Sequence, residues 1–86
     1  MSLTAEFERT AQQAKSLPEQ PDEVLLELYG LYKQATVGDV SGDAPGMFDF
    51  VGRAKYDAWK SREGMDRDSA MRAYIARVGE LANAAR

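Results

Sequence analysis

The last third of the sequence has a hydrophobic period that fits an α-helix and does not fit a β-strand. Its apolar side chains recur at steps of three and four residues, which places them on one face of a helix. These residues are Met71, Tyr74, Ile75, Val78, Leu81, Ala82 and Ala85. No segment of the chain shows the alternating period of two that is typical of strands. The sequence therefore predicts an all-α fold.

Three further helices are expected upstream, because proline and glycine divide the rest of the chain into short helical segments. The expected helices span residues 4–16, 22–36, 50–62 and 66–84 of a single domain, 1–86. Thr4 is expected to cap the first helix, and Asp66 with Ser69 the last. The segment 37–49, rich in turn-forming residues, is expected to be a loop. A loop of this length in so small a domain is often functional.

The composition removes most classes of catalytic site. The chain has no cysteine and no histidine, which excludes disulfides, thiol nucleophiles, histidine-based triads and nearly every zinc site. No close pair of carboxylates is evident, so we expect a binding protein that is not an enzyme and has no metal or cofactor. Since no signal peptide or membrane-length apolar run is recognised, a cytoplasmic monomer is the default expectation.

Charge is distributed unevenly along the chain, whose net charge is -3. Residues 1–30 carry six acidic and two basic side chains, whereas residues 50–77 carry seven basic and four acidic ones. The overall acidity argues against nucleic-acid binding, which needs a broad basic surface. The basic segment is either a solvated face of mixed charge or a site for one small anionic ligand.

Most basic residues have an acidic residue three or four positions away, the spacing of helical ion pairs. The residues with such a neighbour are Arg9, Arg53, Lys60, Arg62, Arg67, Arg72 and Arg77. Lys33, Lys55 and Arg86 have none, and Pro18 separates Lys15 from its nearest acid. Such lysines either lay their stems on apolar surface with the ammonium in water or hold a phosphate.

Two tyrosines share a helix face with one of these lysines. Tyr29, Tyr32 and Lys33 span an arc of about 100° on the second helix, and Tyr74 lies on the apolar stripe of the last one. Phenol rings offer flat surfaces for a base or an apolar chain, and their hydroxyls can bond phosphate. The alternative is that these aromatic side chains fill the core. The pattern predicts a helical domain that binds a phosphorylated, partly apolar small molecule.

Two large aromatic side chains outside this face are expected to have a structural role. Trp59 and Phe7 are both expected to be core residues, because large aromatic side chains tend to be buried.

Four sequence strings resemble the acyl-CoA-binding protein family. They are YGLYKQATVGD at 29–39, PGMFDF at 45–50, KYDAW at 55–59 and AMRAYI at 70–75. The similarity extends over about 7–81, nearly the whole chain. It implies an up-down-down-up four-helix bundle that binds and transports medium- to long-chain fatty acyl-CoA esters without chemistry. Contacts with membranes or acyl-CoA-using enzymes would then be transient.

The resemblance also implies roles for individual residues. Matching positions assign Tyr29, Lys33 and Lys55 to the 3′-phosphate and adenosine of CoA.

Other matching positions surround the rest of the ligand. The resemblance gives Tyr32 and Tyr74 contacts with the nucleotide and pantetheine, and gives Lys15 contacts with the phosphates and the thioester end. Two positions depart from the family pattern. Val51 stands where many members have a basic residue, and Tyr56 where many have tryptophan. The first would weaken anion binding and the second would alter a contact near the ligand.

Two other function classes remain open from the sequence. A helical interaction module, or the binding domain of an enzyme, would dock a partner helix on an exposed apolar stripe. That surface would need no convergent cations, so the unpaired lysines favour a small anionic ligand. A catalytic role comes third, because histidine and cysteine are absent.

Overall fold

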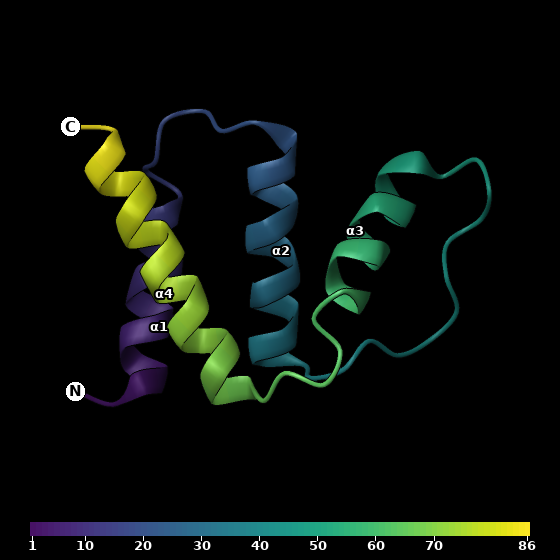
Figure 1. The fold of residues 1–86 in the computed structure, drawn as a ribbon, viewed down its shortest axis with the longest axis horizontal. Helices are drawn as coiled ribbons and strands as arrows, with labels where there is room; N and C mark the ends of the chain where they lie inside the picture. The colour runs from purple at the N-terminus through teal and green to yellow at the C-terminus, as the bar shows by residue number, and fades with distance from the viewer.

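The computed structural model describes all 86 residues and contains four α-helices (Figure 1). They are α1 (Leu3–Ala14), α2 (Asp22–Thr36), α3 (Phe50–Lys60) and α4 (Arg67–Ala84). In Figure 1, α1 and α4 run in one direction and α2 and α3 in the other, which is the up-down-down-up order. The predicted all-α, four-helix fold is confirmed. None of the helices combines the length and the apolar character needed to cross a membrane.

Side-chain caps set the first residues of two helices. The Ser2 hydroxyl accepts a hydrogen bond from the Ala5 backbone N–H at 3.1 Å, so α1 begins before Thr4. The prediction of Thr4 as the cap is therefore wrong, because Ser2 satisfies the free N–H groups first. At α4 the prediction is confirmed: the Asp66 carboxylate accepts from the Ser69 backbone N–H at 3.0 Å and from its hydroxyl at 2.7 Å.

Tight terminal turns shorten two helices relative to the prediction. After α1, the Lys15 N–H donates to the Gln12 carbonyl three residues back, at 3.2 Å. After α3, the Arg62 N–H donates to the Trp59 carbonyl in the same way, at 3.0 Å. Bonds of this three-residue type commonly tighten the last turn of a helix. The α-helical segments therefore end at 14 and 60, whereas the sequence pattern predicted 16 and 62.

The core lies between α1, α2 and α4. Helix α4 packs against both α1 and α2, whereas α3 packs only against α2. The buried apolar residues come from these three helices: Phe7, Leu28, Leu31, Ala35, Ala70, Tyr74 and Val78. Phe7 is thus a core residue, as predicted. Helix α3 contributes no buried residue, so its place in the fold depends on α2 and on the loops at its two ends.

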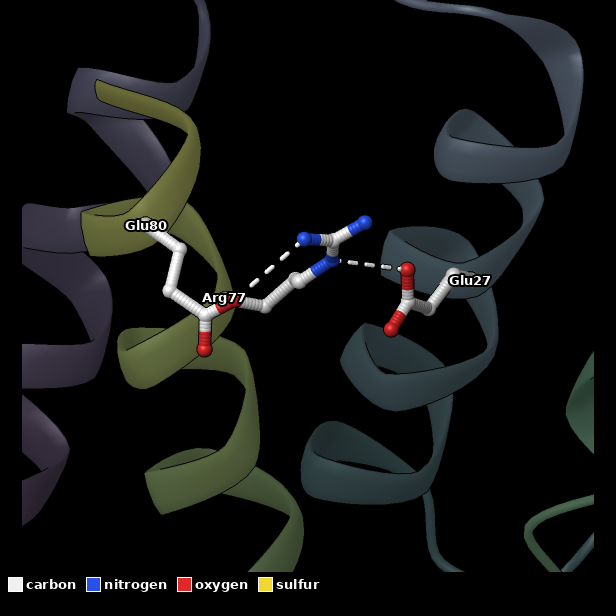
Figure 2. Close-up of polar contacts among 3 residues, drawn as sticks. All are labelled: Glu27, Arg77 and Glu80. Carbon is white, nitrogen blue, oxygen red and sulfur yellow. Dashed lines mark hydrogen bonds and ion pairs between the residues drawn. The ribbon is translucent and has the colours of Figure 1, made fainter. Parts of the chain in front are cut away.

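An ion pair joins α2 to α4 at the edge of the core (Figure 2). The Arg77 guanidinium bonds to Glu27 with an Nε–Oε1 distance of 2.9 Å and to Glu80 with an Nη1–Oε2 distance of 3.3 Å. The local pair between Arg77 and Glu80 was predicted and is confirmed. The contact with Glu27, 50 residues away in sequence, raises the pKa of Arg77 through its hydrogen bond and charge.

The other six basic residues with an acid at this spacing form no ion pair. Arg53 donates instead to the Pro45 carbonyl at 3.1 Å, and Arg67 to the Val37 carbonyl at 2.9 Å. An exposed ion pair contributes little free energy, so these two side chains bond to loop carbonyls instead. The acid three or four residues away is therefore a poor guide to the partner of a basic residue in this chain.

A partly buried polar cluster fixes the first turn of the 37–49 loop against the turn between α3 and α4. The Gln34 side chain is buried, and its Nε2 donates to Asp39 Oδ1 at 2.8 Å and to the Met65 carbonyl at 2.7 Å. Asp39 Oδ1 also accepts from the Gly64 N–H at 2.9 Å. Gly64 has φ 92°, a conformation that favours glycine. The cluster joins the segment that precedes α3 to the segment that follows it, so it helps to position α3.

Replacing Asp39 by Ala should lower the melting temperature at neutral pH. Hydrogen bonds from Gly64 and Gln34 hold the pKa of Asp39 below its ordinary value of 3.8. A carboxyl with a lowered folded-state pKa stabilises the fold above the unfolded-state pKa, and this contribution is lost as pH falls through the folded-state value. The difference in melting temperature between Asp39→Ala and wild type should therefore be constant from pH 7 to about 5 and shrink below pH 3.8.

Thermal melts followed by circular dichroism over this pH range measure the effect. Asp43→Ala is the matched control, since Asp43 is an exposed loop aspartate, and it should leave the melting temperature unchanged. A difference for Asp39→Ala that persists undiminished at the lowest pH would contradict the assigned role of the carboxylate.

Candidate ligand-binding site

Two lysines lie across the boundary between α2 and α3, each over an aromatic ring of the other helix. Lys33 Nζ of α2 is 4.8 Å from the centroid of the Trp59 ring of α3. Lys55 Nζ of α3 is 5.5 Å from the centroid of the Tyr29 ring of α2. Since Tyr29 and Lys33 are one turn apart, as are Lys55 and Trp59, all four side chains line one seam. The structure thus brings together three of the predicted site residues.

The seam exists because α2 and α3 approach closely at Gly30. This glycine is buried, and a Cβ atom at its position would stand 2.5 Å from the carbonyl oxygen of Ala58. Only a residue without a side chain allows this approach. Gly30 was not among the predicted site residues, although a glycine within a helical pattern is a recognised sign of close packing.

Trp59 was predicted to lie in the core, and this prediction is wrong. Its side chain is half-buried at the seam, where Nε1 donates to the Gly38 carbonyl at 2.7 Å and the ring lies beneath Lys33. The indole N–H needs an acceptor when it is covered, and the first turn of the 37–49 loop supplies it. Trp59 therefore joins the loop to the cationic site.

Neither Lys33 nor Lys55 forms an ion pair. Absence of a salt bridge alone does not distinguish them, because most basic residues of the chain also lack one. Their aromatic partners do distinguish them: a cation over a ring face is attracted by the ring quadrupole. An ammonium has three N–H donors and the ring contact uses the charge alone, so the donors remain available to an anion.

Tyr32 and Tyr74 belong to a cluster of three rings from α1, α2 and α4. Tyr32 stacks on Phe7 with centroids 5.6 Å apart, and Tyr74 meets Phe7 at 5.2 Å and Tyr32 at 6.0 Å in edge contacts. Tyr32 is 41% exposed whereas Tyr74 is 5% exposed. Burial and the neighbouring Tyr32 raise the pKa of Tyr74, so it stays a neutral phenol. Tyr32 is partly open to solvent, and the buried Tyr74 packs against its ring.

An apolar groove begins beside Lys55. It has a volume of about 370 Å³ and lies between the first turns of α2 and α3. Its walls are Asp22, Leu25, Leu26, Phe50, Val51, Ala54 and Lys55. Leu25 and Phe50 are 51% and 74% exposed, so the groove is open to solvent. Since Lys55 belongs to both the groove and the seam, the two form one continuous surface.

Lys15 stands apart from the other predicted residues. It follows the last residue of α1, is exposed, and its Nζ donates to Gln12 Oε1 at 3.1 Å. The end of α1 is joined to the start of α2 (Figure 1), whereas Lys33 lies eleven residues along α2 from Asp22. At 1.5 Å per residue, this is about 16 Å. Lys15 therefore lies at the opposite end of the bundle from Lys33. No acidic cluster that could hold a metal ion is present.

Comparison with known proteins gives independent support. The family model described as acyl CoA binding protein matches residues 4–78. An acyl-CoA-binding protein of Ricinus communis is 52% identical over 82 residues, which cover 94% of this chain and 91% of the relative. The crystal structure of Oryza sativa acyl-CoA-binding protein 2 superposes with a TM-score of 0.96 at 48% identity, covering 98% of this chain and 94% of the other.

A more distant structure shows the same fold. The crystal structure of the acyl-CoA-binding protein from Moniliophthora perniciosa has a TM-score of 0.86 at 41% identity, covering 99% of this chain and 84% of that one. The family model covers most of the sequence, and both the sequence relative and the structures agree with it. The chain belongs to the acyl-CoA-binding protein family.

Proposed function

We propose that this protein is a non-catalytic carrier that binds medium- to long-chain fatty acyl-CoA esters. The observation that carries the proposal is the seam of two lysines and two aromatic rings, continuous with an apolar groove. An acyl-CoA has the matching form, since a multiply anionic nucleotide is joined to an apolar chain. The relatives in Ricinus communis and Oryza sativa are named for binding this class of molecule.

The seam would hold the nucleotide end of the ligand. Lys33 and Lys55 would donate to the 3′-phosphate, which supplies the counter-charge that no carboxylate provides. Tyr29 lies beneath Lys55 on the same seam, where its ring would contact adenosine. Tyr32, whose side chain is partly exposed, would contact the nucleotide and pantetheine, and the buried Tyr74 would hold Tyr32 in place.

The groove would shield the acyl chain from water. Burying one methylene contributes about 0.8 kcal/mol, and the groove wall is mostly apolar. Lys15, at the opposite end of the bundle from Lys33, would meet a more distant phosphate or the thioester end of the extended ligand. Binding of this kind keeps a detergent-like ester monomeric, and it requires no nucleophile or general base.

Calorimetric titration with C8, C12 and C16 acyl-CoA tests the proposal. The affinity should rise up to about fourfold for each added methylene until the groove is filled. Free CoA should bind much more weakly than any of the esters, because it lacks the apolar chain.

The control ligand is the free fatty acid of the same length, which has the tail without the nucleotide. If free CoA and palmitoyl-CoA bind equally well, the groove has no role in binding. If free palmitate binds as tightly as its CoA ester, the lysine seam has none.

A further inference from the structure

Four apolar side chains project into solvent where the 37–49 loop meets α3. Met47, Phe48, Phe50 and Val51 are 68% to 84% exposed. We refer to these four residues as the apolar tip. Soluble proteins seldom expose so many large apolar side chains within five residues, and such patches mark interaction sites.

The position of the apolar tip leaves it free to meet a surface. Helix α3 packs only against α2 and has no buried residue. In Figure 1 the loop and α3 lie on the side of α2 away from α1 and α4. The tip can therefore contact a flat partner without any rearrangement of the core.

The charges around the apolar tip balance. Asp49 lies between Phe48 and Phe50 in the sequence, and Asp22 lines the adjoining groove. Arg53 and Lys55 follow within about one turn. The Asp49 carboxylate already accepts from the Gly52 N–H at 2.9 Å, as the cap of α3. The chain as a whole has a charge of -3, which disfavours approach to an anionic surface. A balanced tip on an acidic protein instead suits zwitterionic head groups.

We propose that the apolar tip docks on a zwitterionic phospholipid surface and inserts Phe48 and Phe50 among the head groups. Aromatic and other apolar side chains partition into this interfacial region. A lipid surface is favoured over a protein partner because the four side chains form an exposed apolar group whose nearest charges balance. A partner protein would instead have to present a pocket for each of them.

The apolar tip adjoins the groove directly, since Phe50 and Val51 belong to both. A chain that leaves the lipid phase at this point can enter the groove without crossing water. This second step rests on the proposed acyl-CoA binding, whereas docking itself does not. The tip would thus be the place where the carrier loads or unloads its ligand.

Insertion can be measured with vesicles of brominated phosphatidylcholine, whose bromine atoms quench tryptophan fluorescence at the depth of the acyl chains. Phe48→Trp places a second indole in the apolar tip. Its fluorescence should be quenched on addition of vesicles. The wild-type protein is the control, because its single tryptophan, Trp59, is half-buried. Trp59 lies about 14 Å along α3 from Phe50 and should not be quenched. Absence of quenching in Phe48→Trp would overturn the proposal.

Vesicle flotation measures the binding itself. Phe48→Ser should reduce the fraction bound to phosphatidylcholine vesicles about tenfold, while Val37→Ser, at another exposed apolar residue, should leave it unchanged. Binding should be insensitive to salt and no stronger to vesicles that contain phosphatidylglycerol. Binding only to the anionic vesicles, lost on addition of salt, would overturn insertion at a zwitterionic surface.

Octanoyl-CoA titration separates this proposal from the proposed function. Phe48 is not part of the groove wall, so Phe48→Ser should bind octanoyl-CoA as wild type does. If wild type floats with vesicles but binds no acyl-CoA, the docking surface stands and the carrier function fails. If it binds acyl-CoA but never vesicles, docking fails. A third outcome concerns a protein partner. If wild type does not bind vesicles but forms a complex with an acyl-CoA-using enzyme, and Phe48→Ser does not form this complex, then the apolar tip binds a protein and docking on lipid is overturned.

Discussion

Lys33→Ala is expected to weaken palmitoyl-CoA binding by roughly 10- to 150-fold. A hydrogen bond to a charged group contributes about 1.5–3 kcal/mol, and this converts to that range of affinity. The Lys33 ammonium lies over Trp59 without an ion-pair partner, so a ligand phosphate would be its only strong acceptor. Lys60→Ala is the matched control: Lys60 is an exposed lysine at the end of α3, and its loss should change the affinity less than about twofold on the scale of exposed charges.

The same contact can be tested by changing the ligand, with an ester that lacks the 3′-phosphate. The ester of 3′-dephospho-CoA should bind wild type about as weakly as palmitoyl-CoA binds Lys33→Ala. If the lysine and the phosphate meet, the two changes combined cost less than the sum of the single changes, as in any double-mutant cycle between contacting groups. Calorimetry gives all four affinities. Additive costs would show that Lys33 and the 3′-phosphate do not touch.

Lys55→Ala extends the cycle to the second lysine of the seam. Its Nζ lies over Tyr29, one turn from Lys33 on α2, and both ammonium groups are proposed to bond to one phosphate. The two lysine variants should then be coupled to each other through the ligand. Lys15→Ala, at the far end of the bundle, should combine additively with either of them, since sites this far apart without shared partners are independent.

The sequence predicted the parts of this structure that depend on local pattern. The apolar period of α4 and the prolines before α2 located both helices to within one residue of their ends. Proline restrictions and a side-chain cap act over a few residues, so a single sequence contains them. Tyr29 and Lys33 were singled out from their shared helix face, and Lys55 because no acid lies three or four residues away; the family resemblance supplied the roles assigned to all three.

The contacts between helices could not be predicted from the residues alone. The ion-pair spacing suggested a local partner for Arg53 and Arg67, but loop carbonyls bind both. Trp59 was expected in the core because of its size, and it lies instead under Lys33. These outcomes depend on where α3 rests against α2. Helix periodicity predicts which face of a helix is buried, but it does not predict which other helix or loop covers that face.

Gly30→Ala should reverse the usual effect of replacing a helical glycine. Alanine is favoured over glycine in a helix interior by about 1 kcal/mol, so the change would normally stabilise. Here the new Cβ would stand 2.5 Å from the Ala58 carbonyl oxygen. The atom it meets is backbone and cannot rotate away, so α3 must move. Overpacking typically costs about 1–3 kcal/mol, which exceeds the gain in propensity over most of that range.

Gly79→Ala is the matched control for this substitution. Gly79 lies in α4, and a Cβ atom at its position would meet no neighbouring group within 4 Å. Alanine there should therefore raise the melting temperature by about 4–8 °C per kcal/mol gained. Gly30→Ala should lower the melting temperature in the same assay.

The larger effect of Gly30→Ala should be on binding. Displacement of α3 moves Lys55 from Tyr29 and Trp59 from Lys33, and it widens the groove that both helices line. We expect palmitoyl-CoA affinity to fall at least about tenfold, because a misplaced charged contact is worth about 1.5–3 kcal/mol. Gly79→Ala should bind normally. If Gly30→Ala is stabilised and binds as wild type does, then the close approach of α2 and α3 does not build the site, and the lysines must be positioned by the 37–49 loop instead.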